Sequence, residues 1–224
     1  MLAVSAVVCT ALLTRDARRL GIPSQLVVDC VFFVAVGGIL GARLYFVLLN
    51  LGYFIKYPLE MVMIQNGGLA WQGGLVAGSL MAWWFIKKRK LPLLTTLDLL
   101  APYAALGQAI GRIGCFLNGC CFGKPVAWGI YFPVHEAHLY PTQLYCSFGL
   151  LVIFFILKKF QKSAKRPGEV FFVYLFLASS WRFIVEFFRA DHEILYFGLS
   201  IYQVFCVIVI ALSVYAYTRF KSRP

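Results

Sequence analysis

The stretch Gln25-Leu-Val-Val-Asp-Cys-Val-Phe-Phe-Val-Ala-Val-Gly-Gly-Ile-Leu-Gly-Ala-Arg-Leu-Tyr-Phe-Val-Leu-Leu49 decides the fold class. It is predominantly apolar and longer than the roughly 20 residues that cross the hydrocarbon core of a bilayer. The rest of the chain is similar in character, because 61% of its 224 residues are hydrophobic and only 13% are charged. This composition predicts an all-α, polytopic integral membrane protein.

Seven apolar segments follow one another along the chain. We expect them to form seven transmembrane helices of a single domain, residues 1–224, with ends accurate to several residues. Working outward from residues 25–49, the segments are 1–14 before it and 67–86, 93–116, 144–157, 170–188 and 199–217 after it.

The basic residues predict the topology, because Lys and Arg are retained on the cytoplasmic side of short loops. They gather in residues 15–19, 87–90, 158–166 and 219–223. With seven spans these four clusters fall on one side, which predicts an outer N-terminus and a cytoplasmic C-terminus. The net charge of +12 is then mostly topogenic and faces anionic lipid. Nucleic acid is not an expected partner, because the charge is divided among membrane loops.

A glycine-rich stretch, Gly111-Arg-Ile-Gly-Cys-Phe-Leu-Asn-Gly-Cys-Cys-Phe-Gly123, holds Arg112 and Asn118 at the end of one predicted span. A cation at bilayer depth is costly and marks a functional site by default. Closely spaced glycines allow backbone N–H groups to approach a phosphate. This stretch therefore predicts a site for an anionic group.

Further cations remain outside the topogenic clusters, and most are arginines, whose planar fork suits phosphate and carboxylate. Glu186 follows Arg182 by four residues and precedes Arg189 by three, so the three share one helix face. Either they form a structural ion-pair group, or the excess positive charge serves the same site as Arg112. The remaining cations are Arg43, Lys56, Arg112, Lys124, Arg182 and Arg189.

Three of the seven cysteines, Cys115, Cys120 and Cys121, crowd the glycine-rich stretch. Neither a metal site nor an organic cofactor is expected, because the spacing is no paired CxxC and the histidines lie elsewhere, at positions 135, 138 and 192. A disulfide from Cys115 to Cys120 or Cys121 is one alternative. A packing role, as small apolar side chains, is the other and the preferred one.

Two more patches are polar or glycine-rich where predicted spans begin. The patch Gly67-Gly-Leu-Ala-Trp-Gln-Gly-Gly-Leu-Val-Ala-Gly78 either permits close helix packing or lines a cavity with Gln72 as its polar group. The patch Tyr140-Pro-Thr-Gln-Leu-Tyr145 opens the fifth span and places Gln143 at the membrane interface.

These patches together resemble the prolipoprotein diacylglyceryl transferase family of the bacterial inner membrane. The resemblance covers nearly the whole chain and is specific in its combination and order of motifs. It is carried by Gly41-Ala-Arg-Leu44, residues 67–78, Gly111 to Gly114 with Asn118, Gly119 and Gly123, residues 140–145, and Arg182-Phe-Ile-Val-Glu-Phe-Phe-Arg189.

The resemblance implies a lipid cavity that opens sideways to the membrane. The implied activity moves diacylglyceryl from phosphatidylglycerol to the lipobox cysteine of a preprolipoprotein signal peptide. Catalytic roles would fall to Arg112, Arg182 and Glu186. Substrate contacts would come from Arg112, Arg43, Gln72, Asn118, Gly123, Gln143 and Arg189.

The chain departs from the family pattern at three positions. Gln72 stands where the family usually has histidine, Cys115 where it has asparagine, and Cys120 where it has an acidic residue. Glutamine cannot act as a general base near neutral pH. The first segment is also short, which indicates a late start or a divergent paralogue. Alternatives to the transferase are therefore an inactive phospholipid-binding paralogue and a thiol-redox membrane protein that uses Cys115 with Cys120 or Cys121.

Overall fold

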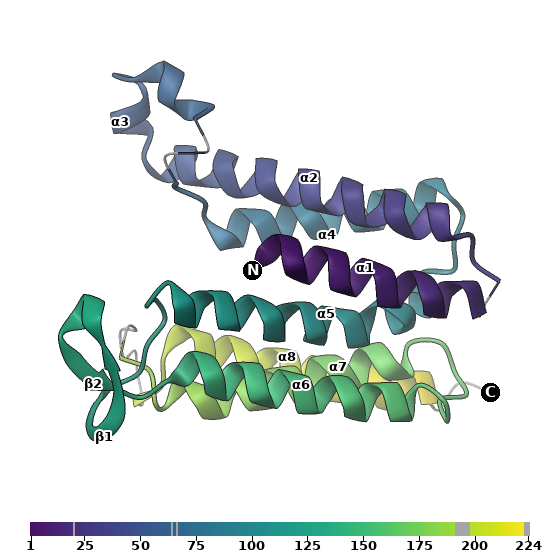
Figure 1. Cartoon of the computed structure of the whole chain (residues 1–224). Helices are drawn as coiled ribbons and strands as arrows, with labels where there is room; N and C mark the ends of the chain where they lie inside the picture. The colour runs from purple at the N-terminus through teal and green to yellow at the C-terminus, as the bar shows by residue number, and fades with distance from the viewer. Residues whose placement is uncertain (20, 64, 66, 191–197, 222–224) are drawn as a thin grey trace. The chain divides into compact units, whose positions relative to one another are not determined.

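The computed structural model of the protein describes the whole chain except residues 20, 64, 66, 191–197 and 222–224 (Figure 1). His192 and Arg223, which entered the sequence analysis, lie outside these described residues. Long helices dominate the described part, each close to one predicted segment. They are α1 (Leu2–Arg19), α2 (Ser24–Leu49), α4 (Trp71–Lys88), α5 (Leu93–Leu117), α6 (Thr142–Phe160), α7 (Glu169–Glu186) and α8 (Ile201–Lys221), with the short helices α3 (Leu51–Phe54) and η1 (Pro58–Met61) between α2 and α4.

Four of these helices have the length and apolar character of a membrane span. The prediction of a mostly helical membrane protein is therefore confirmed in the described part of the chain. Seven spans and an outer N-terminus remain predictions. The four helices cover Ser24–Leu49, Leu93–Leu117, Thr142–Phe160 and Ile201–Arg219.

The chain divides into two compact units, and the single domain of residues 1–224 remains a prediction. Met1–Leu13 with Leu94–Pro224 make the first, called here the large unit, and Thr14–Leu93 make the second, the small unit. Most of α1 therefore belongs with α5 to α8. Within the large unit, the Ser5 hydroxyl donates to the Gly107 carbonyl of α5 at 3.1 Å.

Glycine permits the close packing of α2 on α4 in the small unit. A Cβ on Gly41 would lie 2.7 Å from the carbonyl oxygen of Gly73 and would overlap the Cβ of Ala77. Small residues at such a crossing allow two membrane helices to touch through their backbones. The packing interpretation of the glycine patch at residues 67–78 is therefore confirmed.

A partly buried contact between α5 and the start of α7 fixes α7 in the large unit. The carboxylate of Asp98 on α5 accepts hydrogen bonds from Gly168 N at 2.6 Å and Phe171 N at 2.8 Å. The first N–H groups of a helix have no intrahelical acceptor and carry partial positive charge, so a carboxylate there is doubly favourable. Apolar side chains of α5, α6 and α7 bury one another alongside it: Ala101, Ala105, Ile153, Leu157, Val170 and Tyr174.

A small antiparallel sheet between α5 and α6 departs from the all-α prediction. Strand β1 (Pro125–Phe132) pairs with β2 (Ala137–Leu139), with Tyr131 opposite His138 and an irregularity between Pro125 and Ile130. Figure 1 shows this hairpin beyond the end of the α5 and α6 helices. The hairpin closes the glycine-rich stretch into a loop, and so it bears directly on the site.

Candidate functional site

The glycine-rich stretch lies at the end of α5, where residues 118–124 form a tight loop, called here the cysteine loop. Gly119 has φ +67° and Cys121 has φ +61°. The left-handed region suits glycine but is strained for cysteine. The loop therefore holds Cys121 in a conformation that the surrounding structure must enforce.

Gly123 anchors the cysteine loop between two other segments. Its N–H donates to the Tyr140 carbonyl at 2.9 Å, and the next N–H, of Lys124, donates to the Phe188 carbonyl at 2.8 Å. A Cβ on Gly123 would lie 2.5 Å from the Phe188 oxygen and 2.5 Å from the Tyr140 Cβ. Only glycine fits this position without displacing backbone. Gly123 thus joins the loop to the segment that follows α7.

The first turn of α6 holds the same loop from another direction. Thr142 Oγ1 donates to the Cys121 carbonyl at 2.8 Å, and Gln143 Nε2 donates to the Cys120 carbonyl at 2.7 Å. Both side chains are buried, with 1% of their surface exposed. Gln143 therefore supports the loop through its Nε2, whereas its Oε1 has no hydrogen-bond partner among the described residues. The substrate contact predicted for Gln143 remains a prediction.

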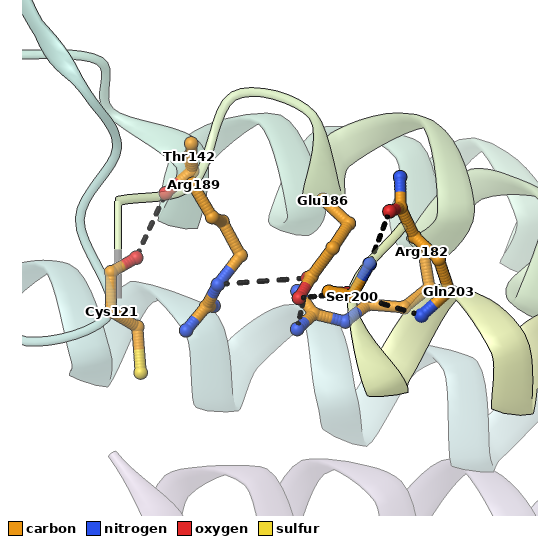
Figure 2. A network of polar contacts seen from close by, with 7 residues as sticks. All are labelled: Cys121, Thr142, Arg182, Glu186, Arg189, Ser200 and Gln203. Carbon is orange, nitrogen blue, oxygen red and sulfur yellow. Dashed lines mark hydrogen bonds and ion pairs between the residues drawn. The ribbon is translucent and has the colours of Figure 1, made fainter. Parts of the chain in front are cut away.

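A buried ion-pair group lies beside the loop (Figure 2). Glu186 Oε2 is 2.6 Å from Arg182 Nη2 and 3.7 Å from Arg189 Nε. The helical spacing in the sequence predicted these contacts, and they are present. One carboxylate faces two guanidinium groups, so the group keeps a formal charge of +1. Arg182 Nη1 is buried and has no hydrogen-bond partner in the described part of the chain, an arrangement that is costly unless an anion takes that position.

Two polar residues of this group, Ser200 and Gln203, were not predicted from the sequence. The Ser200 hydroxyl donates to Glu186 Oε1 at 3.2 Å. Ser200 N donates to Gln203 Oε1 at 2.9 Å, and Gln203 N donates to Ser200 Oγ at 3.2 Å. The pair is a capping box at the start of α8, and the S-x-x-Q spacing in the sequence is its signal. The Ser200 hydroxyl of this capping box holds Oε1 of the Glu186 carboxylate, while Arg182 and Arg189 lie at its Oε2.

Arg112 lies on α5, six residues before the cysteine loop, and is partly buried. Within the described residues its guanidinium makes no hydrogen bond or ion pair. A hydrogen bond from Cys115, together with the charges of Arg189 and Arg112, holds the pKa of the Cys121 thiol well below its usual range, although burial acts in the opposite direction. Positive charge from α5 and from the segment that follows α7 thus converges on the loop.

The three cysteines of this region are brought together by the loop. Their sulfur atoms all lie within 4.8 Å of one another. All seven cysteines of the chain are free thiols, so the alternative of a disulfide is not realised. The Cys120 thiol donates to the Cys115 carbonyl at 3.6 Å, and the packing role remains a prediction.

Arg43 and Gln72 belong to the small unit. All five N–H groups of the Arg43 guanidinium donate to backbone carbonyls of residues 60–68, at 2.9 Å to Met61, 2.6 Å to Gly67, 2.9 Å to Gly68 and 3.1 Å to Met63, and also to Glu60. Only 7% of the residue is exposed. Its donors are therefore occupied in organising a loop. Gln72 and, in the large unit, Asn118 are exposed, and their substrate contacts remain predictions.

Known proteins are similar to this chain over nearly its whole length. The family model for prolipoprotein diacylglyceryl transferase matches residues 1–219. A phosphatidylglycerol–prolipoprotein diacylglyceryl transferase of Clostridium tetani is 31% identical, with 100% of this chain and 93% of the relative covered. Proteins of the same name from Bacillus cereus (34% identical, 91% of this chain and 79% of the relative covered) and Staphylococcus carnosus (34% identical, 93% and 80% covered) are also similar to this chain. The chain belongs to the prolipoprotein diacylglyceryl transferase family.

Proposed function

We propose that this protein transfers the diacylglyceryl group of phosphatidylglycerol to the cysteine thiol of a prolipoprotein. The observation that carries the proposal is the Arg182–Glu186–Arg189 group. It keeps an excess positive charge, and the buried Arg182 Nη1 has no partner among the described residues. The phosphate of an anionic lipid supplies the acceptor oxygens that such a guanidinium lacks.

The reaction joins the acceptor sulfur to the glyceryl carbon that bears the phosphate. The C–S bond forms as the C–O bond breaks, the proton of the acceptor thiol passes to water, and glycerol phosphate leaves with the bonding pair. Arg112 and Arg182 stabilise the charge that develops on the leaving phosphate, an effect that is large in a dry site. Glu186 holds Arg182 in place, and Arg189 adds to the positive field.

The membrane arrangement belongs to the same proposal. The enzyme lies in the bacterial inner membrane with seven spans, an outer N-terminus and a cytoplasmic C-terminus. Phosphatidylglycerol enters from the bilayer, and the signal peptide of the preprolipoprotein presents its lipobox cysteine. Fusions of a reporter enzyme after each predicted span test the topology. A reporter that is active only outside the cell should be active when it is fused at alternate loops.

Complementation tests the function in cells. The gene is expressed in a conditional bacterial strain whose own diacylglyceryl transferase can be switched off. We expect growth and lipid-modified lipoproteins to return with the wild-type chain and not with Arg182→Ala. Accumulation of unmodified prolipoprotein with a correctly inserted wild-type chain would contradict the proposal.

A further inference from the structure

The three sulfur atoms of Cys115, Cys120 and Cys121 are spaced as ligands of one ion. They lie within 4.8 Å of one another. Three sulfurs that each lie about 2.3 Å from a metal in a trigonal arrangement are separated by about 4 Å. A movement of a few tenths of an ångström at each side chain therefore closes the group around an ion.

Hydrogen bonds hold the backbone of the cysteine loop against α5 and α6 before any ion binds. The Cys120 and Cys121 carbonyls are both bonded by the first turn of α6, and the Cys120 N–H donates to the Cys115 carbonyl at 3.1 Å. The strained φ of +61° at Cys121 is retained only because these contacts enforce it. Strain of this kind, placed where three thiols converge, indicates a function for the sulfurs beyond packing.

We propose that Cys115, Cys120 and Cys121 bind one thiophilic d10 metal ion, zinc in the first place, and that its open fourth position takes the acceptor thiol. The second half of this proposal rests on the proposed function. Zinc sites with three protein ligands and one free position are the catalytic kind. The metal would therefore be part of the reaction and not only a brace for the loop.

The charges around the loop suit such a complex. Three thiolates and Zn²⁺ carry a net charge of −1, which is costly near the membrane unless it is compensated. Arg112 precedes Cys115 by three residues on α5, and Arg189 lies beside Cys121 (Figure 2). Both guanidinium charges act on the sulfur of Cys121. The positive charge needed to hold an anionic zinc–thiolate group is thus already present.

Metal binding would supply an activation step for the acceptor thiol. A thiol that coordinates zinc is deprotonated by the metal, and its proton is released to water. The zinc-bound sulfur then attacks the glyceryl carbon, and glycerol phosphate leaves. Zinc keeps its oxidation state throughout, so no oxidant or reductant is required.

The test measures metal on the purified full-length chain, kept in detergent with a non-thiol reductant. The apo protein is titrated with Zn²⁺ and, as a spectroscopic probe, with Co²⁺. We expect about one ion per chain, with sulfur-to-cobalt charge-transfer bands. The variant with Cys115, Cys120 and Cys121 all changed to Ser should lose both. The matched control changes the other four cysteines, Cys9, Cys30, Cys146 and Cys206, to Ala and should keep both.

A second variant guards against misfolding of the triple mutant. Cys115→Asn with Cys120→Glu introduces the residue types that the family pattern has at these positions, and it should remain monodisperse while losing the ion. Equal metal binding by the parent and the triple variant would overturn the proposal. So would a disulfide from Cys115 to Cys120 or Cys121 in the protein isolated under reductant, which would favour redox chemistry.

Addition of the acceptor separates this inference from the proposed function. A lipobox peptide should change the Co²⁺ spectrum, and the same peptide with Ser in place of its Cys should not. An unchanged spectrum with the Cys peptide would overturn the fourth-ligand role. Diacylglyceryl transfer by a metal-free chain would overturn this inference and leave the proposed function intact. If the holoprotein binds the metal but transfers no diacylglyceryl group, the metal site would stand and the proposed function would be overturned.

Discussion

Glu186 holds Arg182 by one edge only: its Oε2 lies 2.6 Å from Arg182 Nη2, while Arg182 Nη1 is buried without a hydrogen-bond partner among the described residues. The ring of Tyr202 lies 5.8 Å from the same guanidinium. The carboxylate therefore orients the Arg182 guanidinium and leaves N–H donors for an anion. An ion pair with a purely structural role would not need to leave such donors.

Glu186→Gln tests this orienting role. Removal of one charge from a buried ion pair leaves the other charges uncompensated, so we expect the free energy of unfolding to fall by about 3 kcal/mol. Transfer should fall more than phosphatidylglycerol binding, because the arginines remain but are misplaced. Thermal unfolding in detergent and a transfer assay measure the two effects, with Glu136→Gln, an exposed change, as the control. Unchanged stability together with full activity would show that the pair is unimportant.

Arg112→Lys tests bidentate recognition of phosphate. Lysine keeps the charge but lacks the planar fork, so we expect transfer to fall by about 100-fold or more, as for loss of one donor in an anion hole. Membrane insertion should be unaffected, and Arg19→Lys, an exposed change, serves as the matched control. Normal transfer by Arg112→Lys at equal expression would argue strongly against the fork.

Gly123→Ala tests the anchoring of the cysteine loop. The added Cβ would meet the Phe188 oxygen at 2.5 Å, and overpacking of this kind costs about 1–3 kcal/mol. We expect a lower melting temperature and weaker metal binding by the loop. Gly52→Ala is the control, because nothing lies within 4 Å of its added Cβ. Equal melting temperatures for the two variants would mean that the loop has room to adjust.

Arg43→Lys tests the role of the small unit's buried arginine. Lysine has three donors, whereas Arg43 satisfies five backbone carbonyls with its guanidinium. We expect the segment 60–68 to become sensitive to protease and the unit to lose stability. An unchanged cleavage pattern together with a loss of lipid binding would instead support the substrate contact that the sequence predicted for Arg43.

The helices could be predicted from the sequence because hydropathy acts locally. Predicted residues 25–49 became Ser24–Leu49, and predicted residues 93–116 became Leu93–Leu117. The Arg182–Glu186–Arg189 contacts were also within reach, because positions three and four apart on a helix are neighbours. The roles given to these residues in catalysis remain predictions.

The rest depends on contacts between residues far apart in the chain. The three sulfurs converge where the first turn of α6 holds the cysteine loop, and the strands β1 and β2 separate these two segments in the chain. The five carbonyls around Arg43 come from a loop that no local pattern describes. The spacing of Cys115, Cys120 and Cys121 in the sequence does not reveal that their sulfur atoms lie within 4.8 Å of one another, because that proximity depends on the turn at Cys121, with φ +61°.

Transfer by the purified protein tests the central claim most directly. The wild-type chain is reconstituted with phosphatidylglycerol and a lipobox peptide, and the mass of the peptide is followed. We predict that the peptide gains one diacylglyceryl group in thioether linkage, that glycerol phosphate is released in equal amount, and that the same peptide with Ser for Cys is left unmodified. A folded protein that binds phosphatidylglycerol yet leaves the Cys peptide at its original mass would contradict the account.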